Sequence, residues 1–163
     1  MTSEKRDPGP DTGQFLAAVR EWTASFGWQV QSFTRDEEFI VIAPLENDPS
    51  FEQIIWVYNT EHGSFRSLLV SRAVISAERR DAIFELCARI NDGLMFGCVE
   101  YSFSDAVLVF RESADLDISG PLERVLHETS ARVLDLGQRY AVAIDATLKG
   151  EQPEDAVTKA EAH

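Results

Sequence analysis

The order of elements across residues 76–148 constrains the fold of this chain more than any other feature. The elements predicted there are a helix from Ser76, strands at 96–103 and 106–111, and a long helix that follows Pro121 and reaches residue 148. Ser104-Asp105 joins the two strands with a connection of hairpin length. A proline suits the first turn of a helix, because its missing amide donor would have no intrahelical acceptor there. This order predicts an α+β domain.

The residues before Ser76 predict a first helix and four more strands. Apolar residues recur at helical spacing between Phe15 and Phe26, with Thr12 placed to cap this helix and Gly27 placed to end it. Runs of β-branched and aromatic residues predict strands at 28–33, 39–43, 54–58 and 65–74. In the two central runs apolar residues are consecutive, so we expect one face to contact helices and the other a partner. The predicted class is α+β, with an antiparallel sheet and the order α-β-β-β(-β)-α-β-β-α.

Length and composition predict one domain with two tails. Of the 163 residues, 44% are hydrophobic and 26% are charged, which is typical of a globular chain that buries a core. We expect a disordered N-terminal tail at 1–12, one domain at 13–148 and a flexible acidic tail at 149–163, in which a short helical turn is possible from Pro153 to Ala160. Gly137, inside the closing helix, is expected to allow a neighbouring group to approach the backbone closely.

The charge of the chain argues against nucleic acid and membrane partners. The 28 acidic and 15 basic side chains give a net charge of -13, which repels phosphate backbones and anionic lipids. No apolar signal segment precedes the domain, and no run approaches the ~20 apolar residues of a spanning helix. The two cysteines, Cys87 and Cys98, do not form the pattern of a secreted disulfide framework. We therefore expect a cytoplasmic protein.

No pattern of catalytic or metal-binding residues is present in the sequence. His62 lies in a predicted turn, His127 on the polar side of the closing helix and His163 at the end, so all three are expected to be solvated. Cys87 and Cys98 have ten residues between them and lack a nearby histidine or Cys-x-x-Cys pair, so we expect buried thiols and not metal ligands. Because neither GxSxG nor GxxxxGK[ST] occurs, we expect no enzyme activity and no cofactor.

Three short segments give the chain a resemblance to a known family. They are Leu86-Cys87-Ala88-Arg89-Ile90-Asn91, Gly97-Cys98-Val99-Glu100-Tyr101 and Val107-Leu108-Val109-Phe110. With the order of elements and the ending at 150–156, they resemble the YbjN family of bacterial sensory transduction regulators across 15–156. Asn91 is the residue most closely tied to this likeness, and we expect it to cap its helix or to bond a neighbouring strand. Asp92 departs from the family, whose members often carry a basic residue there.

The resemblance implies a fold and a role. The fold of the family is similar to that of the class I type III secretion chaperones, which are small acidic homodimers that hold extended segments of client proteins. It implies a non-enzymatic protein-binding module, chaperone-like or regulatory, that acts as a homodimer. By the same likeness, the helix from Ser76 and the strand 96–103 are expected to form the dimer contact.

Apolar and aromatic side chains supply the candidate binding site. The residues that we single out for protein binding are Ile55, Trp56, Tyr58, Cys98 and Tyr101. Because adjacent strand residues point to opposite faces, either Ile55 or Trp56 should face away from the helices. Two alternatives stay open. One is a small-ligand sensor or enzyme with a pocket lined by Trp56, Tyr58, Cys98 and Tyr101, and the other is an acidic nucleic-acid mimic that occupies a DNA-binding protein.

Overall fold

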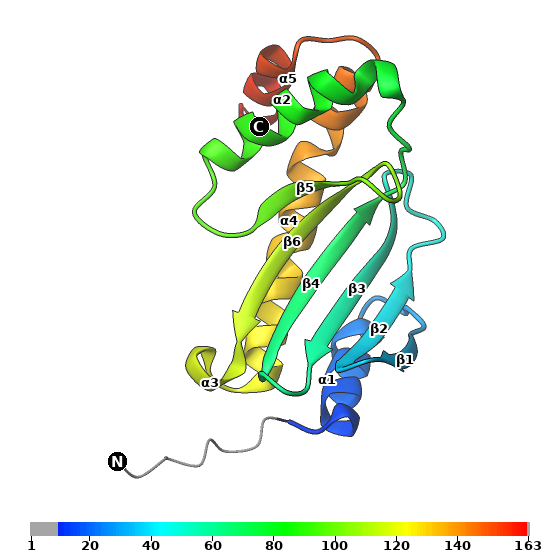
Figure 1. Ribbon diagram of the computed structural model, residues 1–163, viewed down its shortest axis with the longest axis vertical. Helices are drawn as coiled ribbons and strands as arrows, with labels where there is room; N and C mark the ends of the chain where they lie inside the picture. The colour runs from blue at the N-terminus through cyan, green and yellow to red at the C-terminus, as the bar shows by residue number, and fades with distance from the viewer. Residues whose placement is uncertain (1–9, 163) are drawn as a thin grey trace.

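The fold is a six-stranded antiparallel sheet with helices on one face and at one end (Figure 1). The computed structural model describes residues 10–162, apart from the side chains of Asp117 and Ile118. The elements are, in order, α1 (Thr12–Ala24), β1 (Gln31–Arg35), β2 (Glu38–Pro44), β3 (Phe51–Asn59), β4 (Ser64–Ser71), a 3-10 turn (Ala77–Arg79), α2 (Arg80–Asp92), β5 (Cys98–Ser102), β6 (Val107–Asp115), α3 (Leu116–Ser119), α4 (Leu122–Leu148) and α5 (Pro153–Glu161). The strands lie in the order β1-β2-β3-β4-β6-β5, so β1 and β5 are the edges. The α+β class and the antiparallel sheet are confirmed.

The core lies between the sheet and the two helices α1 and α4. Phe15 of α1 stacks on Tyr58 of β3, with ring centroids 4.9 Å apart and planes 11° apart. From α4, Ser130 Oγ accepts a hydrogen bond of 2.8 Å from the indole nitrogen of Trp56. Apolar burial of this kind is the main favourable term in folding, and a buried polar group needs a partner of the kind that Ser130 provides.

Gly137 sets how closely α4 approaches the sheet. A Cβ atom at this position would lie 2.8 Å from Phe51 Cζ and would also overlap Leu69. Both neighbours are buried side chains, so neither can move away cheaply. The predicted close approach at Gly137 is confirmed.

Two helix starts differ from the prediction. Asp11, not Thr12, caps α1: its Oδ1 accepts from the amide of Gln14 at 2.7 Å, while Gln14 Oε1 accepts from the Asp11 amide at 3.0 Å. This reciprocal pair is a capping box, which satisfies two amide donors at once, so it prevails over a single threonine cap. Ser76 precedes the 3-10 turn without a side-chain capping bond, and α2 begins only at Arg80.

The first strand and the hairpin turn also differ in position from the prediction. The first strand was expected at 28–33, but β1 begins at Gln31 because Trp28 packs against the rings of Phe26 and Trp22 outside the sheet. The hairpin turn takes in four residues, 103–106, and not the two expected. Ala106 adopts a positive φ of 55° there, and its amide donates to the carbonyl of Ser102 at 2.8 Å.

The C-terminal segment forms a packed helix in the region expected to be a flexible acidic tail. Pro153, Ala156 and Val157 of α5 are buried against α2 and α4. The hydroxyl of Tyr140 also donates to Glu161 Oε1 at 2.9 Å. Burial of the small apolar residues on one face of this helix holds it against the domain, although the segment is rich in acidic residues. Of the expected N-terminal tail, residues 1–9 lie outside the described residues, and Thr12 already belongs to α1.

Candidate functional site: an open sheet face and an exposed aromatic cluster

The two faces of the sheet have different surroundings. In β3, Ile54, Trp56 and Tyr58 point toward the helices and are almost fully buried. Ile55 and Val57 point to the opposite side, as the alternation of a strand requires. In Figure 1, α1 and α4 lie behind the sheet and α2 and α5 lie beyond its upper end, so no helix of the described residues crosses the near face. We call this uncovered side the open face.

The strand register places aliphatic side chains next to one another on the open face. Ile55 lies opposite Ile42 of β2 and Leu68 of β4, and Val70 lies opposite Val109 of β6. The apolar residues of the open face are Phe33, Ile40, Ile42, Ile55, Val57, Leu68, Val70, Val107 and Val109. Val57, Val70 and Val107 are buried, so the accessible apolar surface consists of the exposed Phe33 and the half-buried Ile40, Ile42, Ile55, Leu68 and Val109. Uncovered faces of antiparallel sheets normally carry polar side chains, so an apolar surface of this kind is typical of one that a partner covers.

Two ion pairs lie on the open face among these aliphatic residues. Arg66 Nη2 lies 2.5 Å from Glu38 Oε1, and Arg111 Nη2 lies 2.7 Å from Glu100 Oε1. The arginine stems add apolar surface while their charged ends stay near water. The open face is therefore apolar but contains groups of both signs.

Cys98 lies on the open face beside Arg111. Its Sγ is 3.6 Å from Arg111 Nη2, which lowers the pKa of the thiol, but burial raises that pKa by more. Burial also raises the pKa of the Cys87 thiol, to about 11. Both sulfurs are therefore held as thiols, which are weak nucleophiles and weak metal ligands.

A second exposed apolar feature joins α2 to the hairpin. The rings of Phe84, Tyr101 and Phe103 contact one another, with centroids 5.0–5.9 Å apart. We call these three residues the aromatic cluster. Phe103 is 78% exposed and Phe84 is 38% exposed. Met95 and Phe96, in the segment between α2 and β5, are also exposed, and Phe96 packs under the guanidinium of Arg132 at 4.5 Å. Such a concentration of exposed aromatic rings is unusual outside interfaces.

The predicted binding residues do not form one surface. Ile55 and Cys98 lie on the open face, whereas Tyr101 belongs to the aromatic cluster. Trp56 is 0% exposed and Tyr58 is 1% exposed beneath the helices, so neither offers surface to a partner in this structure. Phe84 and Phe103 were not predicted from the sequence. Phe84 lies next to the buried residues of its helix and Phe103 directly precedes turn residues, so neither position stands out as part of a binding surface.

Asn91 bonds a neighbouring strand, which was one of the two roles expected for it. Its side-chain amide and carbonyl pair with the backbone of Val99 in β5. This pairing uses polar groups on the outer edge of β5, where an added strand would otherwise bind. At the opposite edge all five residues of β1 are exposed.

Neither a catalytic set nor a metal cluster emerges from the described residues. His62 and His127 are exposed, and His163 lies outside the description. Across residues 10–162, no group of three or more His, Cys, Asp or Glu side chains is placed to hold a metal ion. Within the same part of the chain, no helix is both long and apolar enough to cross a lipid bilayer.

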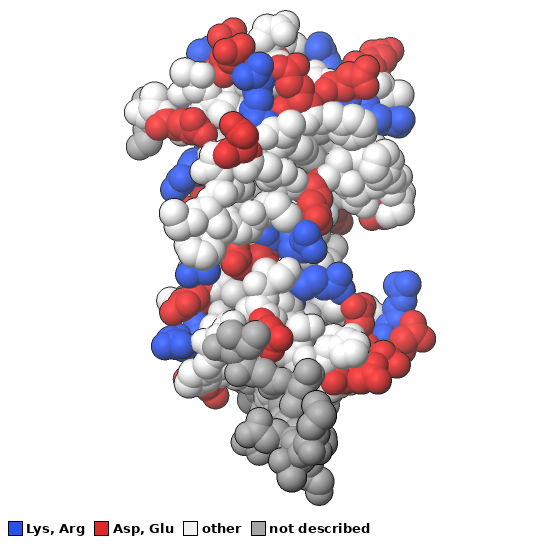
Figure 2. Space-filling model, turned by 60° about the vertical axis from the view of Figure 1, so that its left-hand side comes forward, with Lys and Arg blue, Asp and Glu red and all other residues white. Residues whose placement is uncertain are grey.

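Acidic and basic side chains alternate at the end of the molecule formed by α2 and α5. Arg89 lies 2.8 Å from Glu85 and 3.4 Å from Glu154, and Lys159 lies 2.6 Å from Glu151. Figure 2 shows red and blue atoms interleaved over this upper end, with uncharged surface below it. A nucleic-acid mimic needs rows of unpaired carboxylates, and this face does not favour that alternative.

Comparison with known proteins finds no matching family model, no matching curated protein and no matching solved structure.

Proposed function

We propose that this chain is a non-enzymatic protein-binding module, chaperone-like or regulatory, that acts in the cytoplasm as a homodimer and holds an extended segment of a client protein. In this proposal the chain is a member of the YbjN family, and its fold is related to that of the type III secretion chaperones. The open face is the observation that carries the proposal, because its aliphatic side chains lie together without a covering layer.

The client is an extended segment with alternating apolar side chains. Such a segment lies along the exposed edge strand β1 and directs every second side chain toward Phe33, Ile40 and Ile42. Main-chain pairing at the edge then supplies affinity, and the aliphatic surface supplies specificity. Each Å² of apolar surface that the client removes from water contributes about 25 cal/mol before the costs of ordering.

The dimer contact involves α2 and β5, where the aromatic cluster, Met95 and Phe96 are exposed. Aromatic and methionine side chains are enriched at the centres of interfaces. Because the proposed client edge β1 and the strand β5 of the aromatic cluster are opposite edges of the sheet, one chain binds a second copy and a client at the same time.

A pull-down from native cytoplasm tests the client proposal. The wild-type chain is expected to recover one partner near stoichiometrically, and Ile55→Asp is expected to lose it. Ile55→Thr, which retains a β-branched side chain, guards against simple unfolding of the aspartate variant. The control is Val142→Asp, which makes a similar change at an exposed aliphatic residue of α4. Equal recovery with Ile55→Asp and Val142→Asp, or no partner at all, contradicts the proposal.

The runner-up function is a small-ligand sensor. One observation favours it: a defined pocket beside Trp28, whose lining differs from the one predicted from the sequence.

A further inference from the structure

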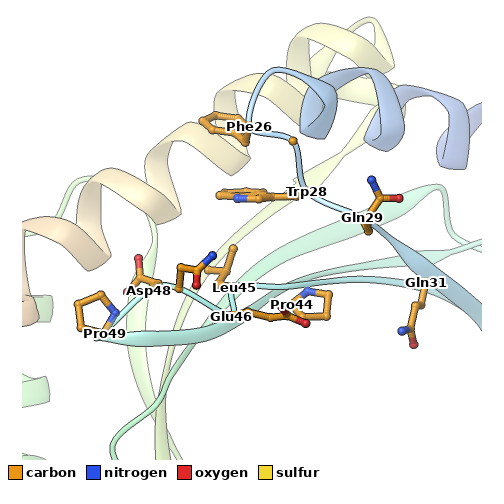
Figure 3. Close-up of a pocket in the computed structure, with 11 residues that line it drawn as sticks. Phe26, Trp28, Gln29, Gln31, Pro44, Leu45, Glu46, Asp48 and Pro49 are labelled. Carbon is orange, nitrogen blue, oxygen red and sulfur yellow. The ribbon is translucent and has the colours of Figure 1, made fainter.

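A pocket lies between the end of α1 and the loop that joins β2 to β3 (Figure 3). Its volume is about 560 Å³, which is within the range of small-molecule sites. None of the residues that carry the open face or the aromatic cluster lines it. The pocket adjoins the proposed client edge at Gln31, the first residue of β1, but a ligand bound in it does not require the proposed client.

Stacked aromatic rings form one wall of the pocket. The ring centroids of Phe26 and Trp28 are 4.5 Å apart and their planes differ by 18°. Gly27, between them, has a φ of 70°, a conformation that glycine adopts easily, and this turn brings the two rings together. In Figure 3 the Trp28 ring lies between Phe26 and the loop, so its other face is turned toward the loop.

A half-buried tryptophan, Trp22, links this wall to the core. Trp22 contacts Phe26 at 4.9 Å and Trp28 at 5.9 Å, and on its other side it packs against Trp56 in the core at 5.7 Å. The position of the exposed rings is thus fixed by the core. A rigid aromatic wall binds a ligand without first having to be ordered.

The opposite wall is also rigid. Arg72 donates hydrogen bonds to three backbone carbonyls of the loop region: those of Leu45 and Phe51 at 2.8 Å and that of Asp48 at 3.0 Å. Asp48 Oδ1 in turn accepts from the amides of Ser50 and Phe51 at 2.8 and 2.9 Å. Both walls of the pocket are therefore present before a ligand binds.

The charges that line the pocket have one sign. Glu46 and Asp48 lie on the loop wall, and none of the 11 lining residues is Lys or Arg. Glu46 makes no hydrogen bond or ion pair that the structure records within residues 10–162, so its carboxylate remains available to a ligand. The carboxylates and the negative face of an indole ring favour a cation and disfavour an anion.

We propose that this pocket binds an organic cation, with an alkylammonium or guanidinium group held between the exposed face of Trp28 and the carboxylates of Glu46 and Asp48. The aromatic wall contacts the apolar part of the ligand, and the carboxylates neutralise its charge. The cation is either a free small molecule or a lysine or arginine side chain of a polypeptide, since both present the same chemistry.

NMR titration followed at the indole N–H of Trp28 tests this site. The full chain has three tryptophans, so three indole signals are expected, and Trp28→Phe identifies the relevant one. The probes are butylammonium, butylguanidinium and the peptide Gly-Arg-Gly, with neutral butylurea and Gly-citrulline-Gly as matched uncharged probes. We expect saturable shifts of the Trp28 signal with the cationic probes only.

Charge-removing variants separate specific binding from a general effect of the acidic protein. Glu46→Gln is expected to weaken cation binding by about threefold or more, the scale of one exposed charge contact. The control is Glu52→Gln, an exposed glutamate of β3 outside the pocket, which should leave binding unchanged.

The probes also distinguish the two sources of the cation. Peptide binding at least about tenfold tighter than butylguanidinium assigns the site to a basic polypeptide side chain, whereas equal affinity assigns it to a small cation. Either result supports an organic-cation site. The inference is overturned if no cationic probe gives a saturable shift, if butylurea binds as well as butylguanidinium, or if Glu46→Gln and Glu52→Gln weaken binding equally.

Discussion

Asn91 and Val99 are joined by two hydrogen bonds that tie the end of α2 to the outer edge of β5. Asn91 Nδ2 donates to the Val99 carbonyl at 2.9 Å, and the Val99 amide donates to Asn91 Oδ1 at 2.8 Å. The asparagine side chain thus replaces the backbone of a neighbouring strand. This pairing holds the helix in place and closes part of one sheet edge, while β1 stays open at the other edge.

Asn91→Ala is expected to lower the free energy of unfolding by about 1–2 kcal/mol, because two hydrogen bonds to the strand edge are lost. Urea denaturation followed by circular dichroism measures this change. Asp92→Ala, at the exposed neighbouring position, is the control and should have little effect. If the two variants are equally stable, water replaces both bonds without cost and the pairing does not hold the helix.

Leu126→Ala is expected to cost about 2–5 kcal/mol of stability, the range for truncation of a buried leucine. Leu126 is 1% exposed on the side of α4 that packs on the sheet. Val142→Ala, on the exposed side of the same helix, should change stability by less than about 0.5 kcal/mol. Chemical denaturation measures both free energies of unfolding. If the two variants lose similar stability, Leu126 is not more buried than Val142 and the assigned packing side of α4 is wrong.

Gly137→Ala should destabilise the protein by about 1–3 kcal/mol, because the added methyl group overlaps Leu69 and Phe51. The direction of the change in stability is informative, because alanine is favoured over glycine in a helix by about 1 kcal/mol when nothing else changes. Thermal and urea unfolding both report it. A stabilised variant would show that the sheet and α4 can separate at no cost.

Ionisation of Glu112 is expected to lower the free energy of unfolding as pH rises. The side chain is buried on β6 beside Arg132 of α4, with 3.5 Å between Arg132 Nη1 and Glu112 Oε1, and burial raises its pKa above the ordinary value of 4.5 by more than Arg132 lowers it. The folded state therefore holds this proton more tightly than the unfolded state, so the unfolded state gains stability as pH rises through 4.5 toward the raised pKa.

Comparison of wild type with Glu112→Gln isolates this effect. The free energy of unfolding of the wild type, relative to the glutamine variant, should decrease as pH rises above 4.5 and level off once the folded-state carboxyl has ionised. Urea denaturation at a series of pH values measures the difference. A difference that does not vary with pH, or that grows in favour of the wild type, would contradict a raised pKa.

Phe103→Asp is expected to convert a dimer to a monomer, because Phe103 is the most exposed ring of the aromatic cluster. Sedimentation equilibrium of the purified chain at high micromolar concentration measures the change. Val142→Asp serves as the matched control and should leave the dimer intact. A monomeric wild-type chain under these conditions would remove the dimer from the proposed function.

Much of the fold is predictable because local pattern and burial agree. Consecutive apolar residues in β2 and β3 require a sheet with little polar surface, and Gly137 signals a close approach inside a helix. Local pattern misleads where tertiary contacts decide. Trp28 has high strand propensity but packs on Phe26. A helical turn is recognisable at 153–160, but its small apolar face among acidic residues does not reveal that α5 packs against the domain.

The candidate site is less predictable than the fold. Alternation separates Ile55 from Trp56 into opposite faces, but it does not say which face the helices cover. Phe84 and Phe103 are 19 positions apart in the sequence, and only the packing of α2 beside the hairpin brings their rings together. The pocket beside Trp28 likewise depends on the end of α1 lying next to the β2–β3 loop, which no periodicity reveals.

The most direct test of the central claim is methyl NMR of the isoleucine side chains, with the partner recovered by pull-down added to the protein. The account predicts that the signals of Ile42 and Ile55 on the open face change with the partner, while those of the buried Ile54 and Ile83 stay nearly constant. Unchanged Ile42 and Ile55 signals in a saturated complex would place the partner elsewhere and contradict the open face as a binding surface.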